Sequence, residues 1–196
     1  MVSLPLGRHL LQVAHHPKAH IYIDDGRRWL NAHPEARYDA IVANATYHWR
    51  DHASGLLSRE YFQLVRKHLN PGATYYFNTT ESVETVATAL SVFPYGLRVM
   101  NFLVVSDSPI EVAADRWLRV MKSYTLDGRA VIDPIDPRSQ RTLANYEAMA
   151  ESVKGPPRRL GLEGSDSMRA RLGKQRLITD DNMGLEWDPD VAIPWH

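Results

Sequence analysis

The sequence predicts an α/β protein whose largely parallel sheet is covered by helices. Apolar runs typical of strands alternate with segments of helical periodicity up to about residue 110, and polar or turn residues end each run. At 196 residues the chain can bury a sizeable core. We expect one domain at 1–110 and a helical and irregular extension at 111–196.

A strand, a short helix and a second strand form the first predicted unit. Residues 20–23 are an apolar run that stops at a turn, and residues 27–32 follow as a helix. Residues 38–44 form the second strand, and their near-continuous apolar run predicts burial on both faces.

Two further helix and strand pairs follow. Ser58 is a suitable N-cap for a helix that runs to about Leu69, and residues 73–78 form the third strand. Thr80 is the expected cap of the next helix, and residues 98–106 read as a fourth strand. The apolar face of the helix after Ser58 consists of Tyr61, Phe62, Val65 and Leu69.

The pattern changes after residue 110. We expect helices at 111–122 and 141–153, separated by a loop at 133–137 in which each Asp precedes a Pro. Residues 154–176 hold seven Lys and Arg and only two acidic residues, which suits a solvated surface segment. A phosphate or nucleic-acid site is the alternative, but no interleaved aromatic residues support it. The expected anchors of this extension on the sheet are Trp117, Leu118 and Met121.

The amino-acid composition argues against several classes of function. The 23 basic and 23 acidic residues cancel, which argues against binding nucleic acid or an anionic membrane over the whole surface. The sequence has no cysteine, which excludes disulfides, thiolate metal sites and cysteine nucleophiles. No apolar run reaches the length of a membrane-spanning helix, and residues 1–12 are too weakly apolar for a signal peptide. We expect a cytoplasmic location.

Polar residues cluster where three predicted strands end. They are residues 24–26, residues 44–48 and residues 78–80, which include Asp24, Asp25, Asn44 and Asn78. In open α/β sheets ligands bind beyond the carboxyl ends of the strands, so these clusters predict one crevice. A carboxylate there can accept from an adenine amino group, but Asp24 and Asp25 can equally cap the helix that follows. Both readings stay open from spacing alone.

The same residues carry a resemblance to a known family. Residues 23–30, with the sequence IDDGRRWL, resemble the adenine-binding turn of spermidine synthase-like proteins. Further similarity lies in YDAIV at 38–42, LSREYF at 57–62, LNPG at 69–72 and NFLVVS at 101–106. LITDD at 177–181 resembles the closing motif of the membrane-fused bacterial branch, which would make the chain the cytoplasmic part of such a protein.

The resemblance implies a Rossmann-like class I methyltransferase-type sheet flanked by helices. It implies decarboxylated S-adenosylmethionine or S-adenosylmethionine as co-substrate and aminopropyl transfer to an amine in polyamine biosynthesis. From the residues themselves we expect no metal. Asp25 would hold the adenine amino group, with Asp24, Gly26 and Asn44 also on the cofactor side. The substrate crevice would be lined by Tyr47, Asn78 and Thr79.

Two departures from the family pattern bear on activity. Active members carry an aspartate where this chain has Asn44, and an amide cannot accept the proton of the attacking amine. His48 or Asp51 is a candidate base, although both also read as exposed loop residues. The opening strands of the family and their glycine-rich turn have no counterpart before residue 20. We therefore expect an N-terminally truncated domain that self-associates as a homo-oligomer or needs a missing N-terminal half.

Other chemistries are less well supported. His48 and His52 have the i,i+4 spacing of a helical metal site, but their surroundings read as a loop. No Gly-x-Ser-x-Gly nucleophile turn occurs. Three classes stay open: a transferase of aminopropyl or methyl type, a non-catalytic module binding a nucleoside or small amine, and a structural fragment of a larger membrane-fused enzyme. No nucleic-acid partner is expected.

Overall fold

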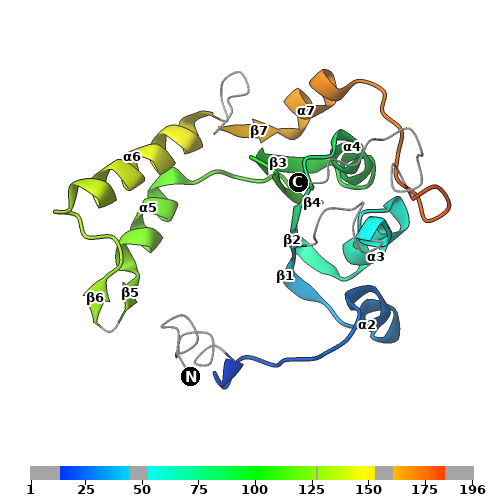
Figure 1. Ribbon diagram of the computed structural model, residues 1–196, viewed down its shortest axis with the longest axis horizontal. Helices are drawn as coiled ribbons and strands as arrows, with labels where there is room; N and C mark the ends of the chain where they lie inside the picture. Colours follow the sequence, from blue (N-terminus) through cyan, green and yellow to red (C-terminus); the bar gives the residue numbers. More distant parts are fainter. Residues whose placement is uncertain (1–13, 45–52, 127, 153–160, 184–196) are drawn as a thin grey trace, which may run out of the picture.

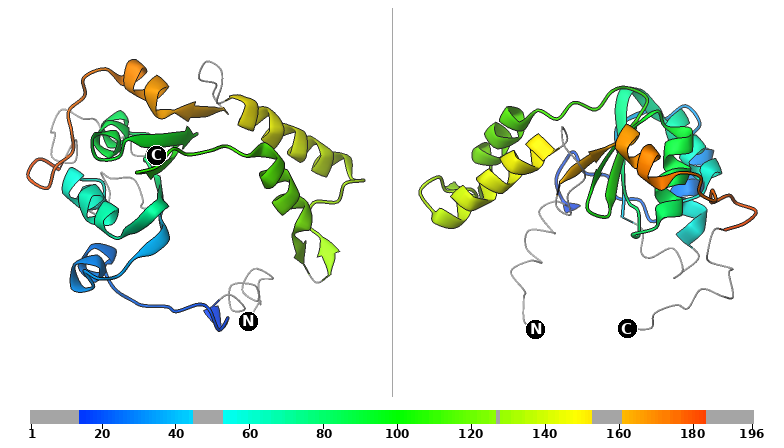
Figure 2. Two further views of the ribbon diagram at one scale, coloured as in Figure 1. Left: turned by 180° about the vertical axis from the view of Figure 1, so that it is seen from behind. Right: turned by 90° about the horizontal axis from the view of Figure 1, so that it is seen from above.

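The computed structural model describes residues 14–44, 53–126, 128–152 and 161–183. Its centre is a five-stranded sheet in the order β1-β2-β4-β3-β7. The strands are β1 (Tyr38–Ala43), β2 (Leu69–Asn78), β3 (Tyr95–Val99), β4 (Phe102–Ser106) and β7 (Leu162–Gly164). Helices α2 (Gly26–Ala32), α3 (Arg59–Lys67) and α4 (Val83–Val92) lie along one face of this sheet (Figures 1 and 2).

The predicted α/β class is confirmed, but the largely parallel sheet is wrong. In the described part of the chain only β1 and β2 pair in parallel, while β2–β4, β3–β4 and β3–β7 are antiparallel. The sequence suggested one strand at 98–106, whereas the chain turns back at Met100, which has a positive φ of 54°. The residues on both sides of this turn are mostly apolar, so the sequence reads as one long strand rather than as the β3–β4 hairpin.

The predicted N-cap is correct for α3 and wrong for α4. Ser58 caps α3 as expected, because its side chain accepts a hydrogen bond from the Tyr61 backbone amide. The cap of α4 is Ser82, not Thr80. Thr80 has a φ of 55° in the left-handed region, which an extended N-cap residue does not adopt.

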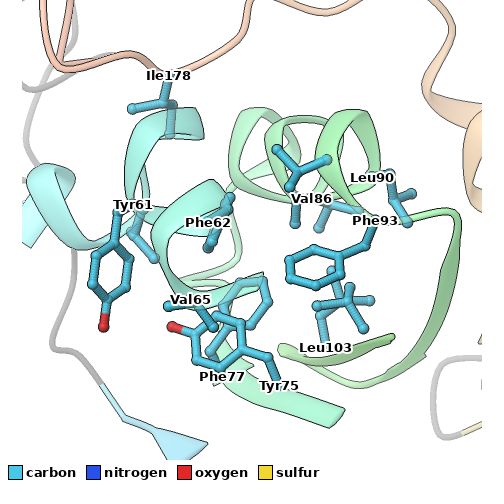
Figure 3. Packing of buried hydrophobic residues seen from close by; sticks show 14 of the residues in the cluster. Tyr61, Phe62, Val65, Tyr75, Phe77, Val86, Leu90, Phe93, Leu103 and Ile178 are labelled. Carbon is cyan, nitrogen blue, oxygen red and sulfur yellow. The ribbon is translucent and has the colours of Figure 1, made fainter. Parts of the chain in front are cut away.

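The core lies between this sheet face and helices α3 and α4. Phe62 on α3 is fully buried against Tyr75 and Phe77 of β2, with ring centroids 6.1 Å and 5.1 Å away. Phe93 and Leu103 close the cluster on the α4 side (Figure 3). Aromatic pairs of this kind contribute about 0.5–1.5 kcal/mol each beyond the area that they bury.

The segment after residue 161 belongs to this core. β7 extends the sheet beyond β3, and helix α7 (Ser165–Leu172) packs on α4. Met168 is completely buried, and its Cε lies 3.4 Å from where a Cβ on Gly96 would stand. The expectation of a solvated surface segment at 154–176 is therefore wrong for residues 162–172, because apolar residues between the arginines fill the core.

An arm made of α5 (Ala114–Ser123) and α6 (Pro137–Glu151) stands away from the sheet (Figures 1 and 2). A small ribbon of β5 (Thr125–Leu126) and β6 (Arg129–Ala130) joins the two helices. The expected anchoring of Trp117, Leu118 and Met121 on the sheet is wrong, because α5 packs on α6 and buries no residue fully. The domain division near residue 110 stays a prediction.

The beginning of the described chain differs from expectation. Residues 20–23 are not a strand, and Ile21, Tyr22 and Ile23 are 68%, 64% and 101% exposed. An apolar run forms a strand only beside a partner, and no described strand lies beside this one. β1 is correspondingly an edge strand with exposed residues, so its predicted burial on both faces is wrong.

Candidate functional site

A hollow of about 450 Å³ lies between β1, the first turns of α2 and the start of α3. Most of its wall is apolar or aromatic, and no charged side chain occurs among the described residues that line it. The wall consists of Gly26, Trp29, Leu30, Tyr38, Ala40, Ile41, Val42, Ala43, Asn44, Leu56 and Tyr61. A wall of this composition suits a flat, uncharged ring with few polar contacts.

Aromatic contacts hold this wall in place. The Trp29 indole stacks on His33 at 4.0 Å between ring centroids, and its Nε1 donates to the Tyr38 hydroxyl at 3.3 Å. Tyr61 stands at the margin of the core cluster (Figure 3). Burial raises the pKa of the Tyr61 hydroxyl, which also shares a hydrogen bond with Tyr75. The Tyr61 hydroxyl therefore stays protonated at neutral pH.

The predicted adenine turn adjoins the hollow. Gly26 lines it, and a Cβ there would meet nothing within 4 Å. Asp25 is the N-cap of α2, with its Oδ1 2.8 Å from the Arg28 amide nitrogen, while Asp24 forms an ion pair with Arg28. Of the two carboxylates predicted as possible caps, Asp25 takes that role. The second carboxylate oxygen of Asp25 can still accept from a ligand.

The predicted polar residues at the ends of β1 and β2 come together. Asn78 Nδ2 donates to Asn44 Oδ1 at 3.3 Å, and Asn101 Nδ2 donates to Asn78 Oδ1 at 3.0 Å. Thr79 is fully buried, and its hydroxyl donates to the Asn101 carbonyl at 2.8 Å. Sequence reasoning gave Asn101 no role, because its place in the β3–β4 turn depends on the hairpin that was missed. Tyr47, His48 and Asp51 lie outside the described residues.

A clamp formed by Arg27, Ser58 and Asp180 connects the first turn of α2 to the N-cap of α3. Arg27 makes two hydrogen bonds to the Asp180 carboxylate and one of 3.0 Å to the Gly55 carbonyl. Ser58 Oγ donates to Asp180 Oδ1 at 2.6 Å. The hydrogen bond from Arg27, aided by that from Ser58, lowers the pKa of Asp180 although its burial acts in the other direction. The motif at 177–181 thus ties α2 to α3, a role that the sequence pattern did not reveal.

The described residues contain neither a metal-binding cluster nor a membrane-spanning helix. The described ranges hold no group of three or more His, Asp or Glu side chains placed to bind a metal ion. His48 and His52 fall outside them. No described helix is long and apolar enough to cross a membrane.

A solved structure resembles this fold, although comparisons of the sequence find no match. No family model matches the sequence, and no curated protein matches it. The structure is similar to a probable spermidine synthase from Corynebacterium glutamicum ATCC 13032, with a TM-score of 0.52 and 14% sequence identity. The likeness covers 89% of this chain and 59% of that one.

The chain has the Rossmann-like α/β fold of a spermidine synthase. At this identity the likeness concerns the fold alone, and the chain spans only about 59% of that neighbour. The fold implied by the sequence resemblance is therefore confirmed at the level of a helix-flanked mixed sheet.

Proposed function

We propose that this chain binds the adenosine part of decarboxylated S-adenosylmethionine or S-adenosylmethionine as a spermidine synthase-like transferase domain. The observation that carries the proposal is the hollow bounded by Gly26 and Asn44, the two predicted cofactor residues that line it. In this proposal the base lies against Trp29 and Tyr38, and its amino group donates to Asp25, which precedes Gly26 in the chain and is not itself among the lining residues. The nucleoside then extends along β1 toward Asn44.

The residues present fit an adenosine in composition. The wall offers aromatic faces for stacking and no charged group among its described members. Gly26 leaves open space in which a flat ring can approach the backbone. The S-adenosyl group, when bound, supplies an electrophilic carbon next to its sulfonium. The residues of this chain would hold and orient it.

Aminopropyl transfer by this chain is expected to be slow. The attacking amine must lose a proton as its nitrogen bonds to carbon and the carbon–sulfur bond breaks, releasing the thioether. Asn44 cannot accept that proton, and general-base assistance is worth about a hundred- to ten-thousandfold. A chromatographic assay with decarboxylated cofactor and putrescine measures the rate. Rapid spermidine formation by the wild type would contradict this part of the proposal.

Titration calorimetry with methylthioadenosine tests the binding site. We expect binding by the wild type and a loss of about tenfold or more for Asp25→Ala and Asp25→Ser. Ser can replace Asp as an N-cap, so Asp25→Ser separates ligand recognition from helix stability, whereas Asp25→Ala also costs about 1 kcal/mol. Equal binding by the wild type and Asp25→Ser would overturn the role of Asp25. Absence of binding by the wild type would overturn the proposed site.

A further inference from the structure

The three asparagines at the ends of β1, β2 and the β3–β4 turn form a directional chain. Each amide side chain has an oxygen that accepts and a nitrogen that donates, and the two are easily exchanged by rotation. Which end of Asn44 faces the hollow therefore depends on what its neighbour Asn78 requires. The neighbouring contacts settle that orientation.

A backbone amide fixes the first link. The Thr80 N–H, which can only donate, lies 2.9 Å from Asn78 Oδ1. Asn101 Nδ2 also donates to this oxygen at 3.0 Å. Rotating the Asn78 amide would set its nitrogen against the Thr80 N–H, so the oxygen of Asn78 must stay where it is.

The second link follows from the first. With Asn78 Oδ1 committed to Thr80 and Asn101, Asn78 Nδ2 points toward Asn44 and needs an acceptor there. The oxygen of Asn44 provides it at 3.3 Å. With Oδ1 turned toward Asn78, the Nδ2 of Asn44 is the end of the amide that is left to donate to a ligand in the hollow that Asn44 lines.

We infer that Asn44 is a specificity-determining hydrogen-bond donor that selects nucleosides carrying an acceptor group, above all a carboxylate, where they meet the end of β1. The inference rests on the proposed nucleoside site. An ammonium group at this position would face N–H donors and find no carboxylate among the described wall residues. The site therefore favours a carboxylate-bearing nucleoside over an amine-bearing one.

Three adenosine compounds that differ only at the 5′ position test this selectivity. They carry a hydroxyl (adenosine), a carboxylate (adenosine-5′-carboxylic acid) or an amine protonated at neutral pH (5′-amino-5′-deoxyadenosine). Calorimetry on the full chain should show the carboxylate bound about tenfold or more tightly than the amine, because a hydrogen bond to a charged group is a strong one. Adenosine should fall between them.

Substitutions at position 44 should change this preference in a defined way. Asn44→Asp keeps an oxygen for Asn78 and presents a second one to the hollow, so the preference should reverse toward the amine. Asn44→Ala removes the donor and should bring the three affinities together. Asn31→Asp adds the same charge at an exposed position of α2 outside the hollow and should leave the order unchanged.

The outcomes separate the two proposals. If all three compounds bind equally and Asn44→Asp changes nothing, the donor role is wrong while the nucleoside site stands. If the wild type prefers the amine, the orientation inferred for Asn44 is wrong. If no compound binds, the proposed site fails and this inference with it. Thermal melting of each variant, compared with the wild type, separates a lost contact from a lost fold.

Discussion

The two edges of the central sheet end in different ways. On one side β7 is only three residues long, and its Glu163 is 7% exposed and bound by two hydrogen bonds from Arg171. On the other side β1 is six residues long, and its Val42 is 69% exposed. Beyond β1 the described chain offers no further strand.

The difference between the two edges suggests that they have different roles. A short edge strand whose buried Glu163 is held by the partly exposed Arg171 does not easily accept another strand, so we expect no further strand to pair with β7. Among the described residues β1 has β2 as its one strand partner, and its residues line the hollow. We therefore expect the β7 edge to govern folding stability, and the β1 edge to govern binding and association.

Truncating the core beneath the β7 edge should have the largest effect. Met168→Ala removes a fully buried side chain that packs near Gly96, and we expect a loss of about 2–5 kcal/mol in the free energy of unfolding. Equilibrium denaturation measures this. Ile135→Ala, at a position 84% exposed, is the control and should cost less than about 0.5 kcal/mol. Similar losses for the two variants would refute a stability-bearing β7 edge.

Self-association through the β1 edge is the next expected effect. We propose that β1 pairs with a second copy, so that the average mass in light scattering rises with protein concentration. Val42→Lys places a charge on this edge and should raise the concentration for half-association by about tenfold or more, since burying one Val contributes about 1.5–3 kcal/mol. Val120→Lys, on an α5 position 43% exposed, is the control. A wild type that stays monomeric at all concentrations contradicts this expectation.

Weakening the clamp of Arg27, Ser58 and Asp180 should have the smallest effect on the free energy of unfolding. Asp180→Asn weakens the contacts with Arg27 and Ser58, and we expect a cost of about 1 kcal/mol at pH 7, reduced because both charged groups are partly exposed.

The pH dependence gives the sign of this effect. The folded state lowers the pKa of Asp180 below its ordinary 3.8. The stabilisation is therefore fully present above that pKa and is lost as pH falls through the lower folded value. Melting curves of wild type and Asp180→Asn should differ by a constant amount above about pH 5 and converge below pH 3.8. A difference that persists in acid would show that the carboxylate charge is not responsible.

Much of the candidate site could be predicted from local sequence. Asn44 and Asn78 stand at the ends of apolar runs, and the structure brings them into contact. Gly26 lines the hollow, and its role toward a cofactor stays a prediction. Asp25 was predictable both as a cap and as a ligand, because capping depends only on the few residues that follow. The roles of Asp25 and Asn44 toward a ligand stay predictions.

The sequence by itself determined the features that depend on neighbours within a few residues. These are the α/β class, the cap of α3 by Ser58, and the polar ends of β1 and β2. The tertiary structure alone decided that 95–106 folds back as a hairpin, that β1 is an edge, and that Asp180 reaches Arg27, 153 positions away. Such contacts depend on how the whole chain packs, because strand direction and edge position follow from which partners remain available rather than from the propensity of any one segment.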